Sequence, residues 1–423
     1  MRFARIAAGG LAALAAGAAV WILGGNAVAG KREREVSRSF EAVFGPRAAL
    51  VAKYAFAASN AEAKKVEELT RAVGYNLAAS KAPNGGSSSS VPEAERAAVS
   101  AYVAAELARD DVAVEAPPPA VGAALASRRV ALSALADALI AGEAPRWAYD
   151  ASAWNEERLS PNGFGHVQVQ RLLIAAALAS VAQGEDVEAA RWLEASWKLN
   201  EGFSSRPEII AQLIAIAVAR YEAAALRKID ANRSVWGPRL ATMGSRTRLL
   251  EAFLLERLDP ADGHARYWHA VRKERSWWGH NLLAVFEEPL ERLSAAAGNK
   301  AWWRAMKAIR DGPAFGEKAS DPPPGNDATG LGIGFSMPNI RDGFRRADRL
   351  ALDAELTEKV LRAKAARAAA GAWPSPSAEI AASCFPGLGW NYRVDGGTMT
   401  IALNRELPRP VAGLVLPTSF SSR

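Results

Sequence analysis

The sequence predicts a mainly α-helical protein, an antiparallel array of α-hairpins followed by a small C-terminal α+β module made of a helix and a β-hairpin. Half of its 423 residues are hydrophobic, alanine is the dominant residue among them, and β-branched runs are few. Alanine has the highest helix propensity of any residue. Apolar residues in the central part recur with helical spacing. Near the C-terminus, two short segments alternate apolar and polar residues around a glycine pair, a pattern typical of a hairpin.

Residues 1–30 have the layout of an export signal or a membrane anchor. Arg2 and Arg5 precede an uncharged stretch, and the charged residues 31–35 follow it. The eighteen residues from Ile6 to Leu23 exceed the usual core of a cleaved signal and approach the length that spans a bilayer. This length favours a retained anchor.

The alternative is cleavage after Ala27-Val28-Ala29, an A-x-A pattern followed by Gly30. Lys and Arg flank both sides of the apolar run, so the positive-inside rule does not fix its orientation. Because translocation of the body is the default for an N-terminal signal, we expect a protein of the bacterial inner membrane. It would have a single N-terminal span and a periplasmic body.

The net charge of +7 comes from 52 Lys and Arg against 45 Asp and Glu. An exported protein rarely meets nucleic acid, so this excess indicates either an anionic membrane surface or an acidic partner, or simply a solvated basic surface. The only cysteine, Cys384, excludes an internal disulfide and lies too far from the signal to carry a lipid at a cleavage site. We expect it to be a small buried residue.

Clusters of Pro, Gly and Ser divide the body. A flexible Ser/Gly linker over residues 82–90 interrupts an N-terminal helical region, and Pro117-Pro118-Pro119 ends that region. A long Pro/Gly-rich tract follows later in the chain, and loops of that length are usually mobile or functional. The domains predicted after the anchor are an N-terminal helical region, a central helical domain, a Pro/Gly-rich loop and a module of a long helix plus a β-hairpin. They cover residues 31–116, 117–311, 312–338 and 339–423.

The central domain contains the best-defined helices. A helix over 167–182 is broken at 184–186, and a second over 187–199 carries acids in its first turn and is expected to stop near Gly202. Ser205 and Glu208 have the spacing of a capping box that opens a third helix.

The third helix is predicted over 207–229. Its apolar stretch, 209–219, is too short to cross a bilayer and therefore indicates a buried core helix. We expect Ile209, Leu213 and Ile216 to pack against the 172–182 segment. The first two helices have the spacing of one tetratricopeptide-like unit, but a single unit does not define a repeat protein.

The C-terminal module is predicted as a helix over 340–370 and a hairpin with strands 390–394 and 398–403 joined at 395–397. A lone hairpin is marginal in water, so its apolar side chains should pack on a helix. These side chains are Trp390, Tyr392, Val394, Met399, Ile401 and Leu403.

The motifs of residues 120–230 and 337–404 resemble a group of uncharacterised bacterial membrane-anchored envelope proteins. The shared features are His166 before a helix, the break at 184–186, the entry Arg206-Pro207-Glu208, the Gly371-Ala372-Trp373-Pro374 turn and the hairpin. In that group the C-terminal module is similar to the C-terminal part of type II secretion pseudopilins. The pilin-like part of this chain lies far from the N-terminal apolar helix, so the resemblance does not imply assembly into a pilus. It implies no catalytic residue.

Few residues indicate chemistry, and we assign no catalytic, cofactor-binding or metal-ligating residue. His264 and His269 are five residues apart and point away from each other on a helix, and His280 lies further on, so a metal site is not indicated. The stretch 330–334 lacks the strand and the spacing of a nucleotide loop and is interpreted as a linker. The tryptophans of the 236–310 region indicate core or membrane-interface packing, with ligand stacking as the alternative. They are Trp268, Trp277, Trp278, Trp302 and Trp303.

One connector offers an alternative function. Asp150 and His166 flank an aromatic and acidic segment that could line a groove, which is the basis for a hydrolase hypothesis. The simpler interpretation is an ordered loop followed by a helix-capping histidine. The connector includes Tyr149, Trp154, Glu156 and Glu157.

The sequence therefore favours a membrane-anchored, extracytoplasmic helical protein that acts without catalysis, through contacts with another protein of the cell envelope. An envelope hydrolase and an accessory component of a secretion or pilus-like system are the alternatives.

Overall fold

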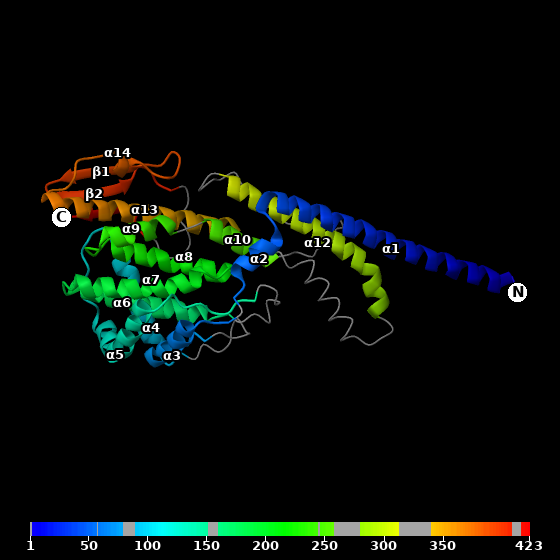
Figure 1. Ribbon diagram of the computed structural model, residues 1–423, viewed down its shortest axis with the longest axis horizontal. Coiled ribbons are helices and arrows are strands. Elements are labelled where there is room, and N and C mark those ends of the chain that lie inside the picture. The colour runs from blue at the N-terminus through cyan, green and yellow to red at the C-terminus, as the bar shows by residue number, and fades with distance from the viewer. Residues whose placement is uncertain are drawn as a thin grey trace. The chain divides into compact units, whose positions relative to one another are not determined.

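The computed structural model is mainly helical, with a small three-stranded antiparallel sheet near the C-terminus (Figure 1). This confirms the predicted fold class. The structure describes residues 2–56, 58–78, 89–150, 160–243, 246–257, 280–312, 340–407 and 416–423. The chain divides into two compact units. The first comprises residues 1–53, 253–312 and 316–338, and the second comprises residues 54–252, 313–315 and 339–423.

The first unit is built on two long helices. Helix α1 (Arg2–Phe44) continues without a break through the predicted anchor and the charge cluster, and α12 (His280–Asp311) packs along it. The short α2 (Arg47–Tyr54) then leads to the second unit. Helices α1 and α12 run in the same direction (Figure 1). Gly25 therefore lies against Pro289 in the earlier part of both helices, and the Val43 carbonyl accepts a hydrogen bond from Arg310 near the end of both.

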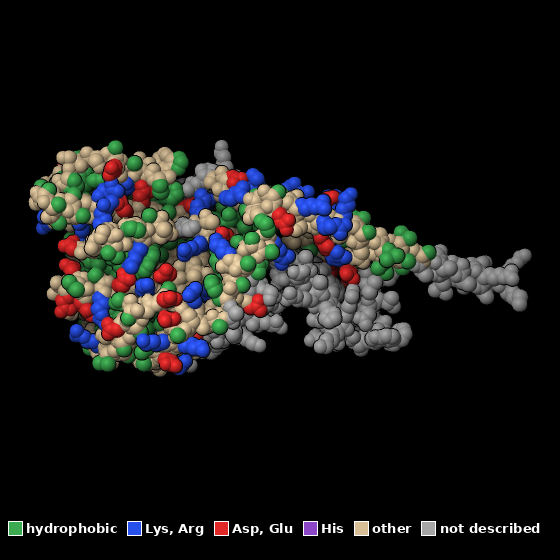
Figure 2. Space-filling model, viewed as in Figure 1, with side chains coloured by type: hydrophobic (Ala, Val, Ile, Leu, Met, Phe, Trp, Pro, Cys, Tyr) green, Lys and Arg blue, Asp and Glu red, His purple; other side chains and the backbone are tan. Residues whose placement is uncertain are grey.

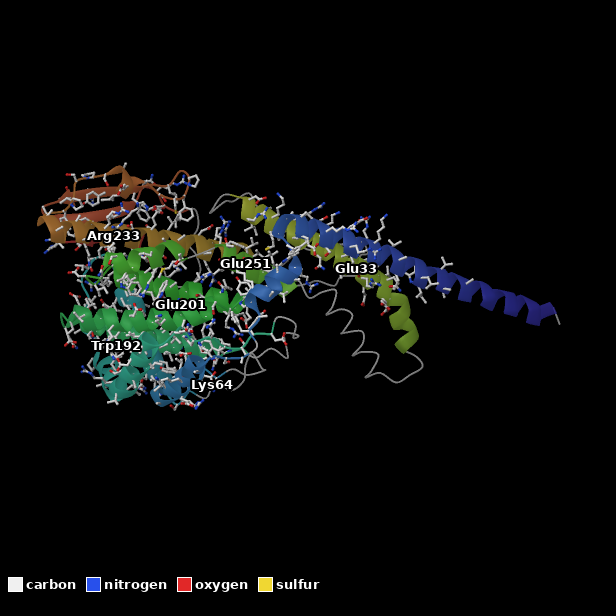
Figure 3. All side chains as sticks on the ribbon, viewed as in Figure 1. Glu33, Lys64, Trp192, Glu201, Arg233 and Glu251 are labelled. Carbon is white, nitrogen blue, oxygen red and sulfur yellow. The ribbon has the colours of Figure 1, made fainter. Side chains whose placement is uncertain are left out.

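The α1–α12 contacts combine close approach with ion pairing. A Cβ on Gly25 would lie 2.8 Å from Cβ of Pro289, so only glycine permits this approach. Arg292 donates to the carboxylate of Glu33 at 2.8 Å and to Oδ1 of Asn26 at 2.9 Å. Glu33 is labelled on α1 in Figure 3.

The second unit contains the remaining described helices and the sheet. Its helices are α3 (Ala61–Val73), α4 (Glu93–Ala108), α5 (Pro119–Ala141), α6 (Gly163–Ala182), α7 (Asp186–Ser204), α8 (Ile209–Leu226), α9 (Arg233–Thr242), α10 (Arg246–Arg257, whose residues from Phe253 belong to the first unit), α13 (Ile340–Ala370) and α14 (Ala378–Ala381). Short turns make α6, α7 and α8 consecutive antiparallel neighbours. Helix α5 packs on α3 and α7, α4 packs on α6, and α13 packs on α8 and α9.

Helices α6 and α8 form the centre of this unit. Both are long and apolar enough to cross a membrane, but 72% of the apolar window of each is buried inside the protein. This confirms the prediction of a buried core helix over 209–219. Ile209 and Ile216 are buried and Leu213 is half-buried. The apolar stretches of these helices are therefore used for packing within the protein.

The predicted start of α6 and the predicted end of α7 are both wrong. Helix α6 begins at Gly163 because the side chain of Asn162 accepts a hydrogen bond from the Gly165 amide at 3.1 Å. Helix α7 does not stop near Gly202, which lies buried inside it. A Cβ there would lie 2.3 Å from the carbonyl oxygen of Pro145, so the glycine permits close packing of the connector.

The predicted capping box is wrong. Ser205 caps the C-terminal end of α7, and its hydroxyl donates to the Gly202 carbonyl at 2.8 Å. The Glu208 carboxylate forms an ion pair with the buried guanidinium of Arg206. Arg206 also donates to the carbonyls of Trp147 and Ala148, 3.3 and 3.2 Å away. Tertiary contacts therefore override the local capping pattern.

The C-terminal module confirms the predicted helix over 340–370 and the hairpin. Strands β1 (Trp390–Asp395), β2 (Thr398–Leu403) and β3 (Ser419–Ser422) form an antiparallel sheet in the order β1-β2-β3. The positive φ angles of Gly396 and Gly397, 55° and 80°, close the two-residue turn. The sequence did not predict β3.

The sheet packs on α13, which lies between the sheet and helices α8 and α9 (Figure 1). Trp390 is buried in the core of this module, and Tyr392 and Leu403 are half-buried against it, as expected. Val394 is 40% exposed, so its predicted packing on the helix is wrong. The core of the module is formed by Leu352, Leu356, Val360, Ala363, Ile380, Phe385, Trp390, Met399, Ile401 and Phe420.

Candidate functional site

Five polar side chains meet inside the core of the second unit. His166 and Gln170 come from α6, Ser196 and Asn200 from α7, and Glu222 from α8, and all five are buried. We call this group the polar ring. Polar groups buried in an apolar core are costly unless they are paired with each other.

Hydrogen bonds connect the polar ring. The Ser196 hydroxyl lies 2.6 Å from Oε1 of Gln170 and 2.7 Å from Oε1 of Glu222. The Asn200 amide donates to Oε2 of Glu222 at 3.5 Å, and Nε2 of Gln170 lies 3.4 Å from Nε2 of His166. Helices α6, α7 and α8 are therefore joined by specific polar contacts as well as by apolar packing.

Burial changes the ionisation of two members of the ring. Loss of solvation raises the pKa of Glu222 to about 8, and hydrogen bonds from Ser196 and Asn200 oppose this shift. Glu222 is thus protonated at neutral pH and can donate its proton to Ser196. The Ser196 hydroxyl then donates to Gln170, so each hydroxyl hydrogen has one acceptor.

His166 is completely buried, and its ring stacks on Phe203 with the ring centroids 3.7 Å apart. Loss of solvation lowers the pKa of His166 to about 3, while a hydrogen bond with Asn200 opposes the shift. Its role differs from the predicted one, since Asn162 caps α6 and His166 belongs to the core. A histidine in this position is neutral and inaccessible to a dissolved substrate.

The other residues of the hydrolase hypothesis are dispersed. Asp150 is exposed, whereas Tyr149 is buried, with the Arg206 guanidinium 5.5 Å from its ring centroid. Trp154, Glu156 and Glu157 lie outside the described residues. The structure does not bring Asp150 and His166 together at an accessible surface.

Several further candidate site residues lie outside the part of the chain that the structure describes. His264, His269, the 330–334 stretch and Trp268, Trp277 and Trp278 are not among the described residues, and His280 is described only as the start of α12. Two of the predicted tryptophans are described, both in α12. Trp302 is buried and Trp303 is half-buried. Within the described part of the chain, no group of three His, Cys, Asp or Glu side chains has the geometry to hold a metal ion.

Cys384 is exposed, and the prediction of a buried thiol is wrong. Its Sγ lies 3.4 Å from Oε2 of Glu355. Partial burial and the neighbouring carboxylate raise the pKa of the Cys384 thiol to about 11. The thiol is therefore a poor nucleophile at neutral pH.

A pocket opens beside the polar ring, with a volume of about 130 Å³. Asn200 belongs to both. Helices α7 and α8 supply most of the walls, and α9, α10 and α13 supply the rest. The pocket is lined by Trp197, Asn200, Glu201, Ser204, Gln212, Ala215, Ile216, Ala219, Thr242, Met243, Arg248 and Leu350.

Neither the polar ring nor the pocket was predicted from the sequence. One signal was present, because His166 and Gln170 in α6, and Ser196 and Asn200 in α7, are spaced four residues apart on one helix face. Glu222 is the only acid in the apolar α8. Polar residues at such spacing on apolar helices indicate a shared buried network.

No family model, curated protein or solved structure matches this chain. The resemblance to bacterial envelope proteins with a pseudopilin-like module therefore stays a prediction.

Proposed function

We propose that the protein is anchored in the bacterial inner membrane by α1 and that its helical body acts without catalysis, by binding another protein of the cell envelope. The observation that carries the anchor is the exposure of apolar side chains on α1. Val20 and Leu23 are each 73% exposed and Val28 is 53% exposed. Apolar side chains facing outward along a helix match a lipid environment.

The predicted cleavage site supports retention of the anchor. Ala29 and Gly30 are buried within the continuous helix α1. They lie between Asn26 and Glu33, the two residues that Arg292 contacts. Because proteases cut exposed, irregular segments, a bond that lies within a continuous helix between two buried residues favours an uncleaved chain.

The partner would bind a groove between α5 and α7. This groove, of about 530 Å³, is lined mainly by apolar side chains, among them the 88% exposed Val187 and the 37% exposed Ile140. Its charged residues are already paired within the protein, since Arg191 contacts Asp137 at 2.6 Å and Glu194 binds Arg239. An uncharged apolar helical segment of the partner fits such a groove.

The surface charge agrees with this choice of partner. On the face shown in Figure 2, basic and acidic side chains are interspersed over the described residues. The excess of Lys and Arg therefore forms no single large field on that face, and the apolar groove is a more selective feature than the net charge.

The alternatives remain hypotheses. The hydrolase hypothesis loses its histidine, because His166 is sealed in the core. An accessory role in a secretion or pilus-like system is compatible with a membrane-anchored binding protein, and it rests on the resemblance of the C-terminal module.

Purification of the protein from native membranes in mild detergent tests the binding role. We expect a stoichiometric partner with the parent chain, and loss of that partner in Val187→Glu, which places a charge in the groove. Val130→Glu is the matched control, because Val130 is 87% exposed on α5 and does not line the groove. Equal recovery of the partner by both variants, or a parent protein without a partner, would refute the proposal.

A further inference from the structure

The inner wall of the pocket beside the polar ring is buried and combines apolar side chains with the amides of Asn200 and Gln212. Ala215, Ile216, Met243 and Leu350 are at most 9% exposed. A volume of about 130 Å³ resembles that of cavities that accept a benzene-sized group. The apolar part of this wall is therefore suited to a short branched hydrocarbon chain of a small ligand.

The mouth of the pocket carries one cation and one anion. Arg248 of α10 and Glu201 of α7 are both exposed, and Glu201 is labelled in Figure 3. Arg248 donates to the Ser204 hydroxyl at 3.2 Å. Over the part of the chain that the structure describes, neither charge takes part in an ion pair, whereas Arg191, Arg206, Arg220, Arg233 and Arg239 of the second unit do.

Two opposite charges that flank one opening without pairing can each bind a ligand group. A guanidinium recognises a carboxylate, and a carboxylate recognises an ammonium group. A ligand that satisfies both while filling the interior has a carboxylate, an ammonium group and a short apolar chain.

We propose that this pocket binds a free aliphatic α-amino acid. Arg248 holds the carboxylate, Glu201 holds the ammonium group, and the side chain lies among Ile216, Met243 and Leu350. The indole of Trp197 adds a flat apolar wall. This site is independent of the groove between α5 and α7, so partner binding and ligand binding are separately testable.

Calorimetric titration of the detergent-solubilised full chain tests the proposal with three ligands. L-leucine carries both charges, 4-methylpentanoate lacks the ammonium group, and 3-methylbutylamine lacks the carboxylate. We expect L-leucine to saturate one site and each analogue to bind about fivefold more weakly or worse, the effect of losing a contact with a partly exposed charge.

Two charge-neutralising variants separate the contacts. Arg248→Gln should weaken L-leucine and 4-methylpentanoate about fivefold or more and leave the amine unchanged, and Glu201→Gln should weaken L-leucine and the amine only. Arg129→Gln and Glu68→Gln are matched controls, because these side chains are exposed and do not line the pocket. Arg248→Lys, which keeps the charge, should retain binding.

Both pocket residues are exposed, so the variants should fold, and circular dichroism verifies this. Two results would overturn the proposal. One is the absence of saturable L-leucine binding by the parent chain at concentrations up to about 10 mM, a weak limit for a ligand of this size. The other is equal L-leucine affinity in Arg248→Gln, Glu201→Gln and the two controls.

Discussion

At the scale of single residues, Glu222 and His166 make stability depend on pH in opposite directions. Glu222 has a pKa of about 8 in the folded protein against an ordinary value of 4.5. The folded protein thus keeps a proton that the unfolded chain releases, and stability falls as pH rises from 4.5 to 8. For His166, about 3 against 6.5, the unfolded chain binds the extra proton, and stability falls as pH drops from 6.5 to 3.

Between pH 4.5 and 6.5 the stability loss from Glu222 and the stability gain from His166 cancel as the pH rises. Above pH 6.5 only Glu222 still contributes, so the loss of stability there comes from this residue. We expect Glu222→Gln to abolish that loss, because the amide keeps a donor for Ser196 and cannot ionise. A pKa unit corresponds to about 1.4 kcal/mol, so at pH 8 the variant should gain on the order of a few kcal/mol.

Urea unfolding of the parent and the variant at pH 5, 6.5 and 8 measures the effect. Glu68→Gln, at an exposed position, is the control and should follow the parent. A parent protein whose unfolding midpoint is the same at pH 6.5 and 8 would contradict a buried, protonated Glu222.

At the scale of secondary-structure elements, glycines set how closely the helices pack. Gly202 in α7 approaches the Pro145 carbonyl so closely that a Cβ would lie 2.3 Å from the oxygen. Backbone cannot move aside as a flexible side chain can. We expect Gly202→Ala to destabilise the second unit by about 2 kcal/mol or more, the cost of forcing an overpacked core apart.

Gly122→Ala is the matched control, because Gly122 lies in α5 and a Cβ there has no atom within 4 Å. Alanine in an open helix position should stabilise by about 0.5–1 kcal/mol. The free energies of unfolding of both variants, measured with urea, test the two directions together. An unchanged free energy of unfolding in Gly202→Ala would mean that Pro145 does not pack closely against α7.

Elements with a local pattern could be predicted from the sequence. Nearly continuous apolar runs were sufficient to predict α6 and α8, and helical spacing was sufficient for α7. The alternation around Gly396-Gly397 was sufficient to predict the hairpin, but its register differs, since Asp395 pairs with Thr398 and does not belong to the turn. Strand β3 could not be predicted, because Ser-Phe-Ser-Ser becomes a strand only by pairing with residues 399–402 of β2.

The errors at the end of α7 and at the start of α8 share one physical cause, which is competition from tertiary contacts. Ser205 and Glu208 would cap a helix in isolation, but Arg206 binds Glu208 and reaches the 147–148 backbone. Gly202 would end a helix in isolation, but the close contact with Pro145 gives it a packing role instead. The polar ring likewise assembles from three helices, and its members are ordinary residues until the helices pack.

At the scale of the whole molecule, the central question is whether α1 remains part of the mature chain and holds it in the membrane. We expect most of the full-length protein to sediment with membranes and to resist a carbonate wash, because an uncharged helical run of this length partitions strongly into lipid. Gly25→Leu is expected to weaken the contact of α1 with Pro289 without releasing the protein from membranes.

N-terminal sequencing of the membrane-bound protein completes this experiment. A soluble mature chain that starts at Gly30 would refute the anchor and leave only export. Val28→Glu is a useful second variant, because a charge there interrupts the exposed apolar stretch and should lower the carbonate-resistant fraction.

The pairing of α1 with α12 has a consequence for the order in which the protein is made. His280, the first residue of α12, is synthesised 236 positions after Phe44, the last of α1. At about 5–20 residues per second, α1 is made roughly 12 to 47 seconds before synthesis of α12 begins. During that interval Asn26 and Glu33 wait without Arg292, and a nascent chain halted before residue 280 presents an N-terminal helix that still lacks its neighbour.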